Sequence, residues 1–188
     1  AGGAWPYAGA PWGTVPHTGA FTVKGPSGVR VRGAIAVNHG DSFRAEANAS
    51  PFLFAGVSAY QGHDDAIEND WNQSGAVVGA HLESYVIYSA RADAGQGGDG
   101  SANVVWLANN WLELAPTPTV YSGTAPGTGG FLQMDSNSPR LVLTGNPFVA
   151  PPVPNTQTPG LHDKLPISSC TPVPARAPAG VCPPPSGA

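Results

Sequence analysis

The densest group of chemically capable side chains lies between residues 62 and 71. Asp64, Asp65, Glu68 and Asp70 place four acidic residues within seven positions. Because carboxylates are ligands of Ca²⁺, these residues form a candidate metal site, and calcium is the candidate cofactor. The segment lacks the glycine and glutamate spacing of an EF-hand loop. A solvated acidic loop, or a short helical turn with acids at its N-terminal end, explains the same residues without a metal.

A second candidate site combines histidine with carboxylate. His81 and Glu83 are two residues apart in a predicted strand and therefore share a face. Together with His162 they would match the two histidines and one carboxylate of non-haem iron sites. An exposed strand face explains His81 and Glu83 without any metal. The sequence contains no Gly-x-Ser-x-Gly and no phosphate-binding loop, so no catalytic residue is predicted.

Aromatic side chains favour binding over catalysis. Tyr88 and Trp106 fall on the apolar phase of two predicted strands, which predicts core packing. Tyr85 and Trp111 fall on the opposite phase. They can face a second buried layer, contact another protein subunit, or stack on a sugar ring with amides such as Asn110 beside them.

β-Strands are the elements that must position these residues. The chain has 25 glycines, 21 prolines and only 11% charged residues, whereas long amphipathic helices need a charged outer face. Alternation over 76–90 and again over 104–114 predicts a long β-hairpin around a glycine-rich loop. Shorter candidate strands lie within 21–37 and 43–47, and at 119–122, 131–134 and 140–144.

These elements predict an all-β fold, a single antiparallel β-sandwich or jelly roll, spanning residues 21–149. An extended N-terminal arm is predicted over residues 1–20, where aromatic residues lie among glycines and prolines that break regular structure. The aromatic residues of the arm are candidates for contact with a neighbouring subunit: Trp5, Tyr7 and Trp12.

A proline-rich tail is predicted over residues 150–188, with Leu161, Leu165 and Ile167 as its apolar anchors. Cys170 and Cys182 lie within this tail and are expected to form a disulfide that closes a small loop. A disulfide is typical of an oxidising environment. We therefore expect the protein to be extracellular, on a cell surface or in a virion.

Charge limits the partners. The net charge is −4 with eight lysines and arginines, which argues against nucleic acid, since basic side chains supply most of that affinity. No apolar run approaches the roughly 20 residues of a membrane-spanning helix. A surface poor in charge suits burial between subunits.

The sequence thus predicts a structural subunit that assembles with copies of itself or with other subunits into an extracellular filament or virion shell, as a capsid or decoration protein. Its two terminal segments would clamp the neighbours. The alternative is a secreted carbohydrate-binding β-sandwich module, in which Tyr85 and Trp111 would contact a glycan.

Overall fold

The computed structural model describes residues 19–26, 28–91, 95–115 and 129–150. These residues form β-strands and no helix. In chain order the strands are β1 (Gly19–Val23), β2 (Arg30–Arg32), β3 (Ile35–Val37), β4 (Asp41–Ala45), β5 (Phe52–Ala55), β6 (Ser58–Glu68), β7 (Gly75–Val78), β8 (His81–Ala90), β9 (Val104–Ala108), β10 (Trp111–Leu114), β11 (Leu132–Met134), β12 (Arg140–Thr144) and β13 (Phe148–Val149).

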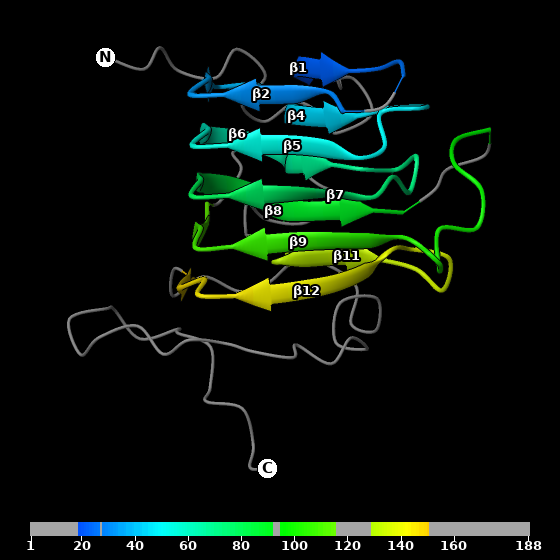
Figure 1. The fold of residues 1–188 in the computed structure, drawn as a ribbon. Helices are drawn as coiled ribbons and strands as arrows, with labels where there is room; N and C mark the ends of the chain where they lie inside the picture. The colour runs from blue at the N-terminus through cyan, green and yellow to red at the C-terminus, as the bar shows by residue number, and fades with distance from the viewer. Residues whose placement is uncertain (1–18, 27, 92–94, 116–128, 151–188) are drawn as a thin grey trace.

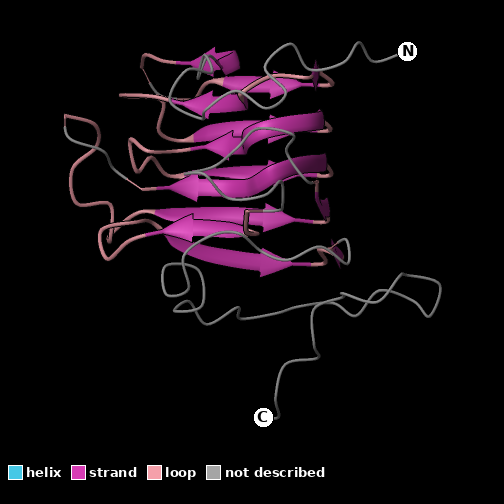
Figure 2. Cartoon of the chain, turned by 180° about the vertical axis from the view of Figure 1, so that it is seen from behind, coloured by secondary structure: helices cyan, strands magenta, loops and turns pink. Residues whose placement is uncertain are grey.

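Every strand pair in the described residues is parallel. One sheet has the order β2, β5, β7, β9, β12. The larger sheet has the order β1, β4, β6, β8, β10, β13, with β3 paired to the first part of β6 and β11 to the last part of β8. The two sheets form two layers whose strands run in opposite directions (Figure 1, and from behind in Figure 2). The chain therefore coils repeatedly through both layers, as a parallel β-solenoid.

The predicted antiparallel sandwich is wrong. The predicted hairpin is replaced by two successive coils, in which β7 pairs with β9 and β8 pairs with β10, all in parallel. A corner at Gly79 divides the predicted strand over 76–90 into β7 and β8. Alternation of apolar and polar residues reports which face of a strand is buried, but it is the same for parallel and antiparallel partners.

The corners between the two sheets share one backbone geometry. Their first residues all have positive φ near 60°: Gly33, Gly56, Gly79, Asn109 and Gly145. Glycine and asparagine adopt this left-handed conformation at the lowest cost. Successive corners also hydrogen-bond to each other, as when the Gly56 N–H donates to the Val78 carbonyl at 2.9 Å. The chain thus turns at the same point of each coil.

The core consists of buried rows that run across the strands. From the smaller sheet, Phe54, Val77 and Leu107 occupy one row in register. From the larger sheet, the facing row is Phe43, Ile67, Tyr88 and Leu132. The rings of Phe43 and Phe54 meet between the layers, with centroids 5.6 Å apart. Each such side chain contributes about 1.5–3 kcal/mol by its burial.

Candidate functional site

The acidic segment belongs to β6 and the residues just after it, so the predictions of a solvated loop or a helical turn are wrong. Asp65 is 5% exposed and Glu68 is 7% exposed. The signal for a loop was the density of charge, since charged side chains are seldom buried without partners. These side chains are buried because β6 lies inside the larger sheet, between β4 and β8.

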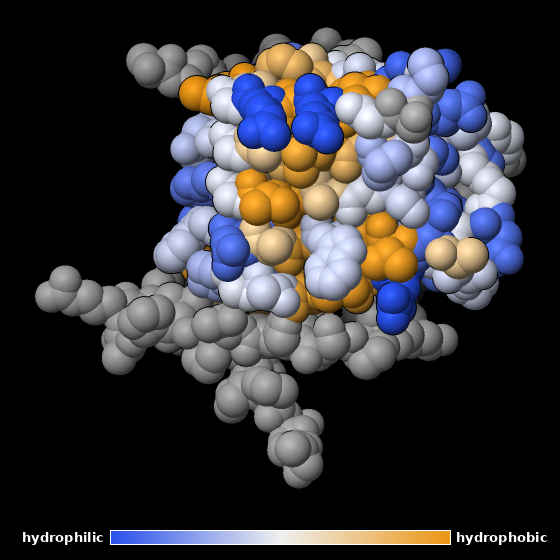
Figure 3. Space-filling model, in the orientation of Figure 1, coloured by the Kyte–Doolittle hydropathy of each residue, from blue (hydrophilic) through white to orange (hydrophobic). Residues whose placement is uncertain are grey.

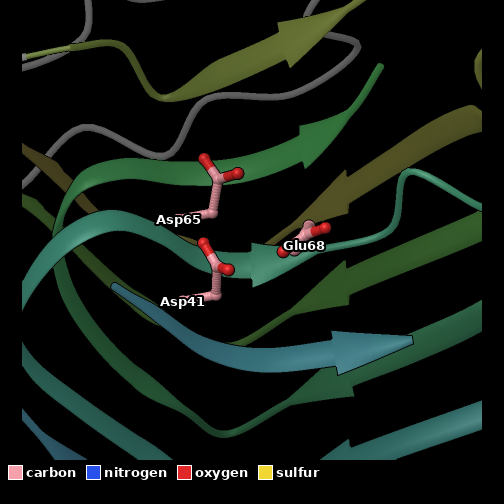
Figure 4. Close-up of side chains that lie close together, drawn as sticks. All are labelled: Asp41, Asp65 and Glu68. Atoms are coloured by element: carbon pink, nitrogen blue, oxygen red, sulfur yellow. The ribbon is translucent and has the colours of Figure 1, made fainter. Parts of the chain in front are cut away.

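A cluster of three buried carboxylates forms where β4 pairs with β6. Phe43 lies opposite Ile67 and Arg44 opposite Glu68 in this parallel pair. The pairing brings Asp41, Asp65 and Glu68 together, with one oxygen of each within 4.8 Å of the others (Figure 4). We call these three residues the acidic cluster. They come from two strands of successive coils.

Arg44 is the cation that contacts the acidic cluster most closely. Its Nε lies 2.8 Å from Glu68 Oε2, and its Nη2 donates to Glu68 Oε1 at 2.9 Å. Its Nη1 lies 3.9 Å from Asp41 Oδ2. Paired contacts of this kind fix a guanidinium and a carboxylate in one geometry. The three carboxylates, when ionised, carry two more negative charges than Arg44 neutralises.

Burial has a strong effect on the acids of the cluster. It raises the pKa of Asp65 well above its usual range, with a further increase from Asp64 and Asp41. Burial, and then the charge of Asp41, raises the pKa of Glu68 to about 10, although Arg44 acts in the opposite direction. Desolvation disfavours the ionised form, so the cluster favours either protons or a second positive charge.

Asp65 is the member of the cluster whose hydrogen bonding is incomplete. Its Oδ1 is buried and has no hydrogen-bond partner among the described residues. An unsatisfied buried carboxylate oxygen is costly. Asp65 thus has one buried oxygen that is available to accept a hydrogen bond or to bind a cation.

The remaining members of the predicted metal site have other surroundings. Asp70 Oδ1 accepts hydrogen bonds from the Ser89 hydroxyl and the Arg91 N–H, both at 3.0 Å, which ties the chain after β6 to the end of β8. Asp64 is half-buried in β6. The structure therefore brings together Asp65 and Glu68, and it adds Asp41. Sequence reasoning missed Asp41 because only the register of β4 on β6 places it there.

His81 and Glu83 lie on the outer face of β8. The His81 ring contacts Tyr60 and Trp111 edge-on, with centroids 5.0 and 6.3 Å apart. Glu113 lies opposite Glu83 in the parallel pair and accepts a hydrogen bond from the Trp111 indole at 3.0 Å. Burial and Glu113 raise the pKa of Glu83. We call Tyr60, His81, Glu83, Trp111 and Glu113 the Trp111 surface. His162, the third member of the iron hypothesis, lies outside the described residues.

The aromatic residues agree with the predictions in part. Tyr85 is fully buried, as in one of its three predicted environments, so it is not a surface contact, and Tyr88 is buried as expected. Trp111 is 39% exposed. Trp106, predicted in the core, is 50% exposed, because the inward positions of β9 are Val105 and Leu107. Alternation identifies the two faces of a strand, but it does not say which face points inward when both carry apolar residues.

Asn110 is fully buried and binds the backbone, so it is not an amide donor on the surface. Its Oδ1 accepts from the Ala80 N–H at 2.9 Å, and its Nδ2 donates to the Val77 carbonyl and to Asn146 Oδ1, both at 3.0 Å. Asn146, at the equivalent corner of the next coil, donates to the Leu107 carbonyl at 2.7 Å. This asparagine pair satisfies backbone groups at the corners.

The predicted contacts of the termini lie outside the described residues. These are Trp5, Tyr7 and Trp12 of the arm, Leu161, Leu165 and Ile167 of the tail, and the cysteines Cys170 and Cys182. Within the described ranges, no helix is long and apolar enough to cross a membrane. No family model matches the chain, and searches of curated proteins and of solved structures found no similar protein.

Proposed function

We propose that the chain is a structural subunit that assembles into an extracellular filament or virion shell. The observation that carries this proposal is the apolar edge of the larger sheet at the first coil; in the smaller sheet, the edge strand β2 of the same coil carries the exposed Arg30 and Arg32. Within the described residues, β3 pairs only with β6, and β3 presents Ile35 and Val37 at 62% and 47% exposure. Phe21, on the edge strand β1, is also exposed. Soluble proteins usually protect edges with charge or proline.

The opposite end of the solenoid supplies a complementary edge. Among the described strands, β12 pairs only with β9 and β2 pairs only with β5, so the backbone at one end of the smaller sheet can accept the parallel strand at the other end of a second copy. A contact between the first coil of one copy and the last coil of another is head-to-tail. Such contacts do not close on themselves and produce filaments unless a rotation closes a ring. Exposed edges thus favour self-assembly through the two ends.

The outer face of the smaller sheet offers a second contact surface. Leu53, Ala76, Trp106 and Val142 form one row in register across β5, β7, β9 and β12. Figure 3 shows this face, where apolar residues occupy much of the surface. A hollow of about 390 Å³ lies here, bordered by Pro51, Leu53, Ala76 and Trp106 among others. Proline-rich segments dock on aromatic-lined grooves, so we assign this hollow to the tail of a neighbouring copy.

The decisive experiment is substitution at the edge of the first coil. Lysine at both Ile35 and Val37 is expected to abolish assembly while the chain stays folded, because buried charge opposes strand addition. Val78→Lys is the matched control, since Val78 is exposed but β7 pairs on both sides. Sedimentation velocity and electron microscopy measure particle size. Particles unchanged in the double variant would contradict assembly through this edge.

Deletion tests the role of the termini. Removal of residues 1–18 and 151–188 is expected to leave a folded solenoid, as measured by circular dichroism, that no longer forms particles. If the truncated chain still formed the same particles, the termini would not be the clamps.

The Trp111 surface favours carbohydrate binding as a second candidate function. Its exposed indole can stack on a sugar ring, and the carboxylates of Glu83 and Glu113 can accept hydrogen bonds from hydroxyl groups. Trp111→Ala is expected to abolish binding on a glycan array. Trp106→Ala, on the other sheet, is the matched control and is expected to bind normally. Absence of binding by the intact protein would contradict this candidate.

A further inference from the structure

We propose that the acidic cluster binds one divalent cation, with calcium as the preferred ion, through Asp41, Asp65 and Glu68. The proposal is independent of assembly and of glycan binding. Its first support is geometric. Ca²⁺ binds oxygen at about 2.3–2.6 Å, so two oxygens on opposite sides of the ion are about 5 Å apart. The oxygens of the three carboxylates lie within 4.8 Å of one another, which matches this limit.

The second support is the unsatisfied oxygen of Asp65. Asp65 is only 5% exposed to solvent, and its Oδ1 has no hydrogen-bond partner among the described residues. A buried carboxylate without a partner destabilises the fold. A cation bound by this oxygen would satisfy it.

The third support is charge. Glu68 is already paired with Arg44 through both of its oxygens, and Asp41 is 3.9 Å from the same guanidinium. One positive charge therefore faces the three carboxylates of the acidic cluster; Arg44 also lies 3.8 Å from Glu46, which Lys24 pairs with at 3.5 Å. A divalent ion brings the group of four side chains to neutrality, whereas a monovalent ion leaves one negative charge buried.

The type of ion follows from the ligand atoms. Carboxylate oxygens suit hard cations, while zinc in proteins is mostly bound by cysteine and histidine. His63, two residues before Asp65 in β6, has its Nε2 at 2.7 Å from Asn38 Oδ1. Mg²⁺ requires near-ideal octahedral geometry and loses water reluctantly, whereas Ca²⁺ tolerates irregular cages. The ligands of the acidic cluster come from two strands of successive coils, β4 and β6. This irregular arrangement favours Ca²⁺ over Mg²⁺.

A bound ion would join the first coil to the second. Asp41 belongs to β4, and Asp65 and Glu68 belong to β6. The side-chain contacts of Arg44 with Glu68 already connect these strands. The cation would add a link that binds only the folded state, because the register of β4 on β6 creates the site. Such a ligand stabilises the folded protein by mass action.

Calorimetric titration of the full chain, stripped of metal with a chelator, tests the proposal directly. Wild-type protein is expected to bind one Ca²⁺ per chain, and its melting temperature to rise by about 5 °C in about 1 mM Ca²⁺. Asp65→Asn keeps the shape of the side chain but removes its charge, and it is expected to lose both effects. Asp99→Asn, at an exposed position of the chain, is the matched control and should behave as wild type.

Two results would overturn the proposal: no Ca²⁺ binding by the wild type, or equal binding by wild type and Asp65→Asn. The first result would mean that protons alone occupy the acidic cluster. Mg²⁺ is expected to raise the melting temperature less than Ca²⁺, and a larger rise with Mg²⁺ would overturn the assignment to calcium. If circular dichroism shows that Asp65→Asn does not fold, Asp41→Asn takes its place. It is expected to lose Ca²⁺ binding and the rise in melting temperature, and binding equal to that of the wild type would overturn the proposal.

Discussion

The asparagine pair and the acidic cluster are both buried polar groups, but they differ in how completely they are satisfied. Each side-chain nitrogen and oxygen of Asn110 and Asn146 makes at least one hydrogen bond, chiefly to the backbone of the corners. In the acidic cluster, Asp65 Oδ1 has no partner among the described residues. A satisfied buried network stabilises a fold, whereas an unsatisfied one costs free energy unless a ligand completes it. The asparagine pair is therefore structural, and the acidic cluster is a place for binding.

The largest expected effect comes from the asparagine pair. Asn110→Ala should lower the free energy of unfolding by about 3 kcal/mol, because the Ala80 N–H and the Val77 carbonyl lose their buried partner. Urea denaturation measures this loss. The exposed Asn137 provides the control, since Asn137→Ala should change stability by less than about 0.5 kcal/mol. Equal effects of the two variants would mean that the asparagine pair contributes no special stability.

A substitution in the acidic cluster should change the free energy of unfolding in the opposite direction. In chelator, Asp65→Asn is expected to raise the free energy of unfolding by about 1–2 kcal/mol, because without a metal Asp65 must either be buried as an unpaired charge or take up a proton on folding, and asparagine avoids both without changing the shape of the side chain. The same urea experiment applies, with Asp99→Asn as the control near zero. A loss comparable to that of Asn110→Ala would show that Asp65 is structural, and the contrast between the two groups would not hold.

The backbone conformation of the corners can be tested without a change in side-chain packing. A Cβ at Gly79 meets no atom within 4 Å, but φ there is 62°. Gly79→Ala should therefore cost about 1 kcal/mol through backbone strain alone. Asn109→Gly, at the equivalent corner, should change stability by less than about 0.5 kcal/mol. Equal costs for the two substitutions would mean that the corners are not constrained by their left-handed residues.

The smallest effect is expected on the outer face of the larger sheet. The pKa of Glu83 is raised in the folded state, so Glu83 contributes stability at low pH that is lost as the pH rises through the folded pKa. Glu113→Gln should lower this pKa and raise stability at neutral pH by at most about 0.5 kcal/mol, since solvent screens the pair. NMR titration of the Glu83 carboxyl measures the shift. A pKa unchanged in the variant would show that burial alone perturbs Glu83.

The positions of several strands could be predicted from the sequence, but their partners could not. The predicted strand over 140–144 is confirmed as β12, because the flanking turn residues and apolar content mark its ends. The hairpin failed because Gly79 divides one alternating stretch into strands of two different sheets. Glycine spacing carried the missing information: Gly33, Gly56 and Gly79 lie 23 residues apart, which indicates a repeating coil.

The candidate site could be predicted only in part, for a related reason. The local density of charge around Asp65 and Glu68 identifies them in the sequence as candidate ligands. Asp41 is isolated in the sequence, and it joins them only through the register of β4 on β6. Pairing between distant strands depends on the packing of both faces, which a local pattern does not contain. Likewise, Trp106 is exposed although core packing was predicted, because both faces of β9 carry apolar residues.

The 23-residue interval between Gly33, Gly56 and Gly79 has a consequence for how such a protein changes length. Duplication of residues 57–79 would insert one more coil that begins and ends at the same point of the turn, so the strands on either side would keep their phase. Each added coil lengthens the stack by one strand spacing, about 4.8 Å. Variation by whole coils would let the axial repeat of an assembly change in small, defined steps while both end coils stay the same.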